Sequence, residues 1–151
     1  MNLKRLMFVA SSILLVSCMA RGPAYVPISH VADNLGMIVI YRPAKFEGNG
    51  ILPGVHINGI QAFELGNGGF GIVELEPGSY RVSTPEDDKW TTEDAPATIS
   101  IEIEEGELLF LRWQPKIEAM NMVDATFIGE FVIVDRSQAE IALKKLAQVY
   151  P

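Results

Sequence analysis

The sequence predicts a mainly β fold, an antiparallel β-sandwich or barrel-like domain of about eight strands with one C-terminal helix. Short runs rich in β-branched and aromatic residues recur from residue 37 to residue 134. Turn residues separate these runs, and Asn58-Gly59 is the strongest hairpin signal, because both residues accept positive φ. From residue 137 the apolar residues change to helical spacing, which predicts the closing helix.

The expected strands follow one another at close spacing. Isoleucines alternate with polar residues over 99–103, a pattern typical of a half-buried strand. By the same alternation, His56 lies on the face opposite to Val55 and Ile57, which is the solvent face. Trp113 is expected in the core or at an end of the barrel. The expected strands span residues 37–41, 55–57, 60–65, 70–75, 80–84, 99–103, 108–113 and 126–134.

The closing helix has both a start signal and an apolar face. Ser137-Gln138-Ala139-Glu140 has the pattern of a capping box, in which the serine and the glutamate satisfy each other's backbone N–H groups. The apolar positions then recur every three or four residues, at Ala139, Ala142, Leu143, Leu146 and Val149. This spacing predicts a helix with one face packed on the strands.

The N-terminal residues have the pattern of a lipoprotein signal peptide. Lys4 and Arg5 precede an apolar run over residues 6–17, which is shorter than the roughly 20 residues that a membrane-spanning helix needs. Leu15-Val16-Ser17-Cys18 is similar to a bacterial lipobox, in which a signal peptidase cuts before the cysteine and its sulfur carries a diacylglycerol. The alternative is a buried N-terminal helix with a free thiol, but nothing caps these residues as a helix.

This interpretation divides the chain into three parts. Residues 1–17 would be the signal peptide, residues 18–36 the lipidated N-terminus and a tether, and residues 37–151 the β-sandwich domain with its helix. Gly22-Pro23 interrupts any helix in the tether. Tyr25-Val26 is apolar enough to pack on the domain.

The same interpretation predicts a location in the bacterial cell envelope. A diacylglycerol and an acyl chain on Cys18 would hold the protein stably on a membrane, because several chains bind far more firmly than one. Met19, rather than an aspartate, follows the cysteine, which favours the outer membrane with the domain facing the periplasm.

The charge of the chain argues against nucleic acid as a partner. The whole chain has a formal charge of −7, and loss of Lys4 and Arg5 with the signal would lower it to −9. Such a domain is repelled by phosphate backbones and by anionic headgroups. Membrane contact is therefore expected from the lipid and not from a basic face.

The residue types that carry catalysis are sparse, so we expect no catalytic residues, no metal and no cofactor. His30 and His56 are the only histidines, and Cys18 is assigned to lipid, which leaves too few ligands for a zinc site. No Gly-x-Ser-x-Gly nucleophile motif occurs. The glycine-rich residues 66–71 lack the Lys-Ser/Thr ending of a phosphate loop, so a hairpin turn with close backbone approach explains them better.

Three residues are candidates for binding. Trp90 lies between the acidic groups 86–88 and 93–94, where an exposed aromatic can stack on a sugar or anchor a protein; it can also fold back over the sandwich edge. The carboxylates around it suit Ca²⁺ or are simply solvated. Arg42 and Arg112 each end an apolar strand, where a guanidinium can bind a carboxylate or phosphate, or pair with the acids of the chain.

Several of these motifs occur in an order that is similar to a known family. They are Tyr41-Arg42-Pro43, residues 55–59, 65–69 and 76–80, the Gly turn and strand over 105–112, and the helix over 139–146. The order and spacing resemble the domain-of-unknown-function 2846 family (DUF2846) of small bacterial lipoproteins, over residues 37–147. The resemblance implies a β-sandwich on a lipid anchor, with no established chemistry. The acidic insert around Glu93-Asp94 departs from the pattern.

These observations favour a non-catalytic interaction or structural module, anchored by lipid, whose loops or sheet edges bind another envelope protein. A glycan- or peptidoglycan-binding module is the alternative, with Trp90 as its main feature. A hydrolase is the third hypothesis, for which the sequence offers no constellation. Fold alone does not decide between them.

Overall fold

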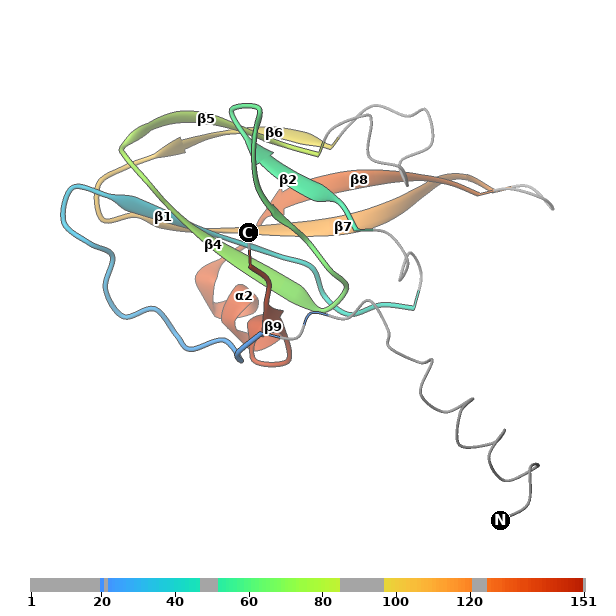
Figure 1. Cartoon of the computed structure of the whole chain (residues 1–151), viewed down its shortest axis with the longest axis horizontal. Helices are drawn as coiled ribbons and strands as arrows, with labels where there is room; N and C mark the ends of the chain where they lie inside the picture. The colour runs from blue at the N-terminus through green and yellow to red at the C-terminus, as the bar shows by residue number, and fades with distance from the viewer. Residues whose placement is uncertain (1–19, 21, 47–51, 85–96, 121–124, 151) are drawn as a thin grey trace, which may run out of the picture.

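The computed structural model describes residues 20, 22–46, 52–84, 97–120 and 125–150, which contain nine strands and one helix (Figure 1). The strands and the helix are β1 (Gly36–Tyr41), β2 (Gly54–Ile57), β3 (Ile60–Glu64), β4 (Gly69–Leu75), β5 (Gly78–Ser83), β6 (Thr98–Ile103), β7 (Leu108–Met120), β8 (Ala125–Ile133), α2 (Arg136–Leu143) and β9 (Ala147–Gln148).

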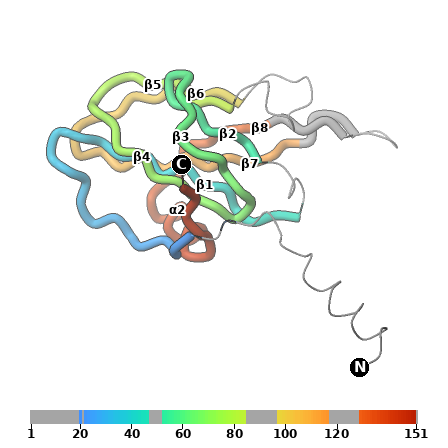
Figure 2. The backbone as a smooth tube through the Cα atoms, in the orientation of Figure 1, coloured from blue at the N-terminus to red at the C-terminus, as the bar shows by residue number. Residues whose placement is uncertain are grey.

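The strands form two sheets that face each other and do not close into a barrel (Figures 1 and 2). One sheet has the order β8-β7-β1-β4-β9, and the other has the order β3-β2-β5-β6. The predicted mainly β sandwich with one C-terminal helix is therefore confirmed. Most neighbours are antiparallel, but β1 runs parallel to β7 and β4 runs parallel to β9. Such pairs join strands that are distant in the sequence, so the alternation within each strand does not reveal them.

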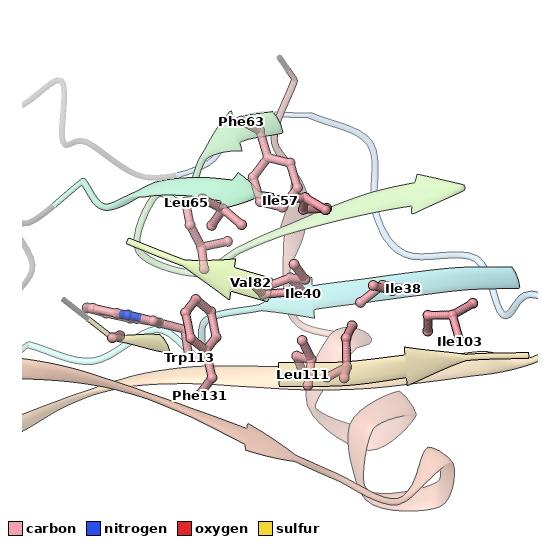
Figure 3. Packing of buried hydrophobic residues seen from close by; sticks show 13 residues of the cluster. Ile38, Ile40, Ile57, Phe63, Leu65, Val82, Ile103, Leu111, Trp113 and Phe131 are labelled. Carbon is pink, nitrogen blue, oxygen red and sulfur yellow. The ribbon is translucent and has the colours of Figure 1, made fainter. Parts of the chain in front are cut away.

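The inner core lies between the two sheets (Figure 3). Ile38 and Ile40 of β1 point toward Val82 of β5, and Trp113 of β7 fills one end of the layer. Trp113 is 2% exposed, which confirms its expected place in the core. Between the buried residues of β2, His56 is only half-buried, as the alternation predicts.

A second core lies on the outer face of the larger sheet. Every residue of β1 is buried, because this central strand is covered on both faces. Val39 and Tyr41 point away from the other sheet and pack under Leu143 of α2 and under Tyr25. The Tyr25 ring meets Phe70 edge-on, with 5.5 Å between ring centroids. A strand buried on both faces reads as a continuous apolar run, which explains why β1 shows no alternation.

Residues 22–31, within the segment expected to be a tether, lie along the domain in this structure. Gly22 donates its backbone N–H to the carbonyl of Gln148, and Ala24 forms an antiparallel bridge with Ala147. Tyr25 is buried, as the sequence suggests, whereas Val26 is 76% exposed. The segment therefore covers part of the outer face of the larger sheet.

The helix differs from its prediction at both ends. It begins after Asp135, which makes no side-chain capping hydrogen bond, so Ser137 lies inside the first turn and the expected capping box is wrong. The helix ends at Leu143, and Val149 donates to the carbonyl of Phe70 beyond a short β9. Leu146 is buried after a turn and not on the helix. Pairing with β4 therefore replaces the last turns of the predicted helix.

The glycine-rich residues 66–71 form a turn, but the expected hairpin is wrong, because β3 and β4 belong to different sheets. Gly68 has φ of 72°, and Gly69 donates to the carbonyl of Gly66 at 3.0 Å. The predicted close approach is confirmed: a Cβ at Gly69 would lie 2.8 Å from Val149 Cγ1. The turn carries the chain from one sheet to the other.

Gly71→Ala should destabilise the domain by about 1–3 kcal/mol, because it overpacks the core between the sheets. A Cβ at Gly71 would lie 2.4 Å from Cε1 and Cζ of the buried Phe63 ring. Urea unfolding measures this cost. In a Phe63→Leu background the added methyl has more room, so Gly71→Ala should cost less there. An equal cost in both backgrounds would show that the two side chains do not conflict.

Candidate functional site

Arg42 is a buried cation inside the sandwich. Its backbone N–H donates to Gly69, which continues the pairing of β1 with β4 and turns its side chain to the inner face. Nη1 donates to the carbonyl of Leu65 at 3.4 Å, and the guanidinium carbon lies 4.8 Å from the ring centroid of Trp113. The side chain is 1% exposed, and desolvation lowers the pKa of Arg42 to about 10. The guanidinium therefore stays charged at neutral pH.

Trp113, which covers this cation, is placed by a glycine on the neighbouring strand. A Cβ at Gly129 of β8 would lie 2.6 Å from the indole Nε1 and 3.0 Å from the Cβ of Ala97. Nε1 is buried without a hydrogen-bond partner among the described residues. Two hydrogen bonds join Thr84 and Ala97, the residues on either side of segment 85–96. The N–H of Thr84 donates to the carbonyl of Ala97, and the N–H of Ala97 donates to Oγ1 of Thr84. The Arg42–Trp113 pair thus lies at the end of the sandwich where that segment leaves.

Arg112 lies on the opposite face of the same sheet. It is the neighbour of Tyr41 in the parallel register and of Val132 in β8, so its side chain points to the outer face. Its Nε is buried without a hydrogen bond, and no carboxylate within the described residues forms an ion pair with it. Burial raises the pKa of Tyr41, while the positive charge of Arg112 acts in the other direction.

The two candidates that lie within the described residues, Arg42 and Arg112, do not form one site. Arg42 and Arg112 are separated by the sheet that carries them both. Trp90 and Cys18 fall outside the described residues, as do the acidic groups 86–88 and 93–94. What the sheet does assemble is one stacked cation–indole pair at one end of the sandwich.

A pocket of about 540 Å³, which no motif in the sequence predicts, lies on the outer side of the larger sheet. Three segments line it: residues 28–33, the turn at Glu105-Gly106, and Arg136 at the start of α2. Arg136 is already engaged, since Nε contacts Glu140 Oε1 at 2.8 Å and Nη2 donates to the carbonyl of Ile28. This arginine ties the N-terminal segment to the helix. No sequence signal could join three segments so far apart along the chain.

The described residues contain neither a metal-binding cluster nor a membrane-spanning helix. No group of three His, Cys, Asp or Glu side chains there is close enough together to hold a metal ion. No helix in the same residues is both long enough and apolar enough to cross a membrane.

A family model described as a protein of unknown function, DUF2846, matches residues 32–126, more than half of the 151-residue chain. The match runs from just before β1 into the start of β8 and so contains the Arg42–Trp113 pair. No curated protein and no solved structure matches the chain.

Proposed function

The chain belongs to the DUF2846 family, and we propose that it is a lipid-anchored protein of the bacterial envelope that binds another envelope protein and catalyses no reaction. The observation that carries this proposal is the N-terminal pattern. A basic start at Lys4 and Arg5, an apolar run and Leu15-Val16-Ser17-Cys18 together direct export and acylation. Acyl chains on Cys18 then hold the domain at a membrane, where a partner is met.

The edges of the smaller sheet support the binding role. Within the described residues, β3 and β6 each pair with one strand only and leave a row of backbone groups free. An extended segment of a partner can add to such an edge by main-chain hydrogen bonds. β6 carries Glu102 and ends beside Glu104, and charges of this kind discourage unspecific pairing. β3 lacks a charge until Glu64 and exposes Ile60, so it is the edge that we assign to the partner.

The backbone geometry of β3 identifies one N–H group to test. Asn58 and Gly59 have φ of 50° and 83°, as in a two-residue turn that favours hairpins. The residues that flank such a turn, Ile57 and Ile60, form the hydrogen-bonded pair. The next pair, His56 and Gln61, then points its backbone groups away from each other, so the N–H of Gln61 faces the open edge.

Gln61→Pro should abolish partner capture while the domain stays folded, because proline removes only an outward N–H and is tolerated on edge strands. Gln61→Ala keeps that N–H and is the matched control. The measurement is crosslinking in the cell followed by mass spectrometry of captured proteins. Cys18→Ala, which lacks the acylated residue, serves as the localisation control.

One dominant protein captured by the parent chain and by Gln61→Ala, and lost in Gln61→Pro and Cys18→Ala, would support the proposal. Equal capture by Gln61→Pro and Gln61→Ala would exclude β3 as the binding edge. Recovery of glycan or peptidoglycan fragments alone would replace the protein partner by the glycan-binding alternative, and Trp90 would be the residue to mutate next.

A further inference from the structure

The N-terminal segment is fixed to the domain almost as far as Cys18. Ala20 donates its backbone N–H to the carbonyl of Asn67 at 3.4 Å, and Gly22 donates to Gln148 at 3.1 Å. A chain of two residues reaches about 7 Å at most. An anchor on Cys18 would therefore hold Ala20 within about 7 Å of the acylated residue, inside the thickness of a lipid headgroup layer.

Three further segments meet Ala20 at this end of the larger sheet. The side-chain amide of Asn67 accepts from the N–H of Lys45 at 3.0 Å and donates to its carbonyl at 2.9 Å, which fixes the segment after β1 here. The C-terminal residues arrive with β9, which lies beside the start of β4 (Figure 1). A Cβ at Gly22 would lie 3.1 Å from Cε2 of Tyr150. Phe46 and Tyr150 therefore lie at the same end of the domain as Ala20, which is two residues from the proposed anchor at Cys18.

Exposed aromatic side chains are confined to this end in the described part of the chain. Phe46 is 95% exposed and Tyr150 is 63% exposed. The other large apolar side chains with high exposure are aliphatic: Val26, Ile60, Ile133 and Ile141. Aromatic rings gain free energy at the boundary between headgroups and acyl chains, where Trp and Tyr are enriched in membrane proteins.

Basic side chains also gather here, although the chain as a whole is acidic. Lys45 precedes Phe46, and Lys144 and Lys145 form the turn that leads into β9. All three are exposed. The N–H of Ala147, which follows this turn, donates to the carbonyl of Gly68 at 3.0 Å, so the turn lies beside the same residues. No basic face is expected from the acidic net charge of the chain, and the sequence does not reveal this one, because its lysines come from segments about 100 residues apart.

From these observations we infer that a membrane-facing end rests on the phospholipid surface; it is made of Ala20, Lys45, Phe46, Lys144, Lys145 and Tyr150. Phe46 and Tyr150 lie among the headgroups, and the lysines face lipid phosphates. This inference rests on the lipid anchor proposed above and adds an orientation to it. The β2–β3 hairpin, with Ile60 after its turn, then points away from the membrane, where its edge is open to a partner (Figures 1 and 2).

The test uses the acylated chain in vesicles of phosphatidylethanolamine and phosphatidylglycerol. Cys18 is the single cysteine, and a thioether to diacylglycerol does not react with maleimide, so an introduced cysteine would be the sole free thiol. An environment-sensitive fluorophore is attached to Phe46→Cys and to Tyr150→Cys. The matched control is Ile60→Cys with the same fluorophore, because Ile60 is also exposed, at 76%. We expect headgroup nitroxide lipids to quench the labels at 46 and 150 several-fold more than the label at 60.

Three other results would each overturn the inference, and they can be told apart. Equal quenching at positions 46 and 60 would reject the orientation. If the wild-type chain at the same time does not react with maleimide, the anchor on Cys18 is retained. Reaction of Cys18 with maleimide in the wild-type chain would reject the anchor itself, and the orientation with it. If the label at position 46 is shielded from solvent only when a protein is captured, and not by lipid, this end binds a protein partner. That result would reject the lipid surface.

Discussion

Cys18→Ala is expected to abolish the incorporation of labelled fatty acid completely, because the chain has no second cysteine whose sulfur could carry a diacylglycerol. The same substitution should leave residues 1–17 attached, since the proposed lipobox places the cut directly before the cysteine that would carry the lipid. Metabolic labelling with palmitate and the mass of the N-terminal peptide measure both effects. The wild-type peptide should begin at residue 18 and carry the added mass of three acyl chains.

Ser17→Ala is the matched control for this result. It keeps a small residue before the cut, so labelling and cleavage should match those of the wild type. Fatty acid on the Cys18→Ala chain, or a free thiol on the wild-type chain, would contradict the assignment of Cys18 as the anchor.

Trp113→Ala is expected to lower the free energy of unfolding by about 3–5 kcal/mol, the range for truncating a buried tryptophan. The indole is 2% exposed, fills the end of the inner core and covers the Arg42 guanidinium at 4.8 Å. Its loss leaves a cavity and removes the aromatic face from a buried charge. Such a cost is a large part of the 5–15 kcal/mol that keeps a typical domain folded, and urea unfolding of the purified domain measures it.

Trp113→Phe keeps an aromatic face in the same place and removes an N–H that has no partner among the described residues. It should cost much less than the alanine variant and remain folded. Ile60→Ala, at a surface position, should change the free energy of unfolding by less than about 0.5 kcal/mol. A cost for Trp113→Ala close to that of Ile60→Ala would show that the cation–indole pair does not stabilise the sandwich.

Local signals in the sequence were sufficient for much of the fold. Asn58-Gly59 predicts its hairpin because only residues that tolerate positive φ suit the turn, and both have positive φ in the structure. The alternation over 99–103 likewise places its isoleucines toward the core. The parallel pairing of β1 with β7 was not predictable, because it depends on which strands meet in space. The end of α2 was missed because Val149 keeps an apolar period while β4 offers it a strand partner.

The candidate site was less predictable than the fold. Arg42 follows an apolar strand, and the sequence does not tell which face of the sheet the strand turns to the second sheet. Its burial against Trp113 depends on Gly129, which is distant in the sequence and leaves room for the indole. Residues 22–31 were assigned to a tether because Gly and Pro interrupt any helix there, yet a segment without a helix can still pair with a strand. Trp90 and Cys18 stay predictions, because they lie outside the described residues.

The bridge between Ala24 and Ala147 cannot form until the C-terminal residues are available. A chain that crosses a membrane with its N-terminus first presents residues 22–24 long before their partners at 147–148 have arrived. β1 likewise cannot complete its pairing until β7, its parallel neighbour, is available. Pairings between distant residues form slowly and leave strands exposed in the meantime. Under the proposed export, the fold would therefore be completed only after transfer of the whole chain, and a chaperone beyond the membrane would bind the edge of β1 that β7 later covers.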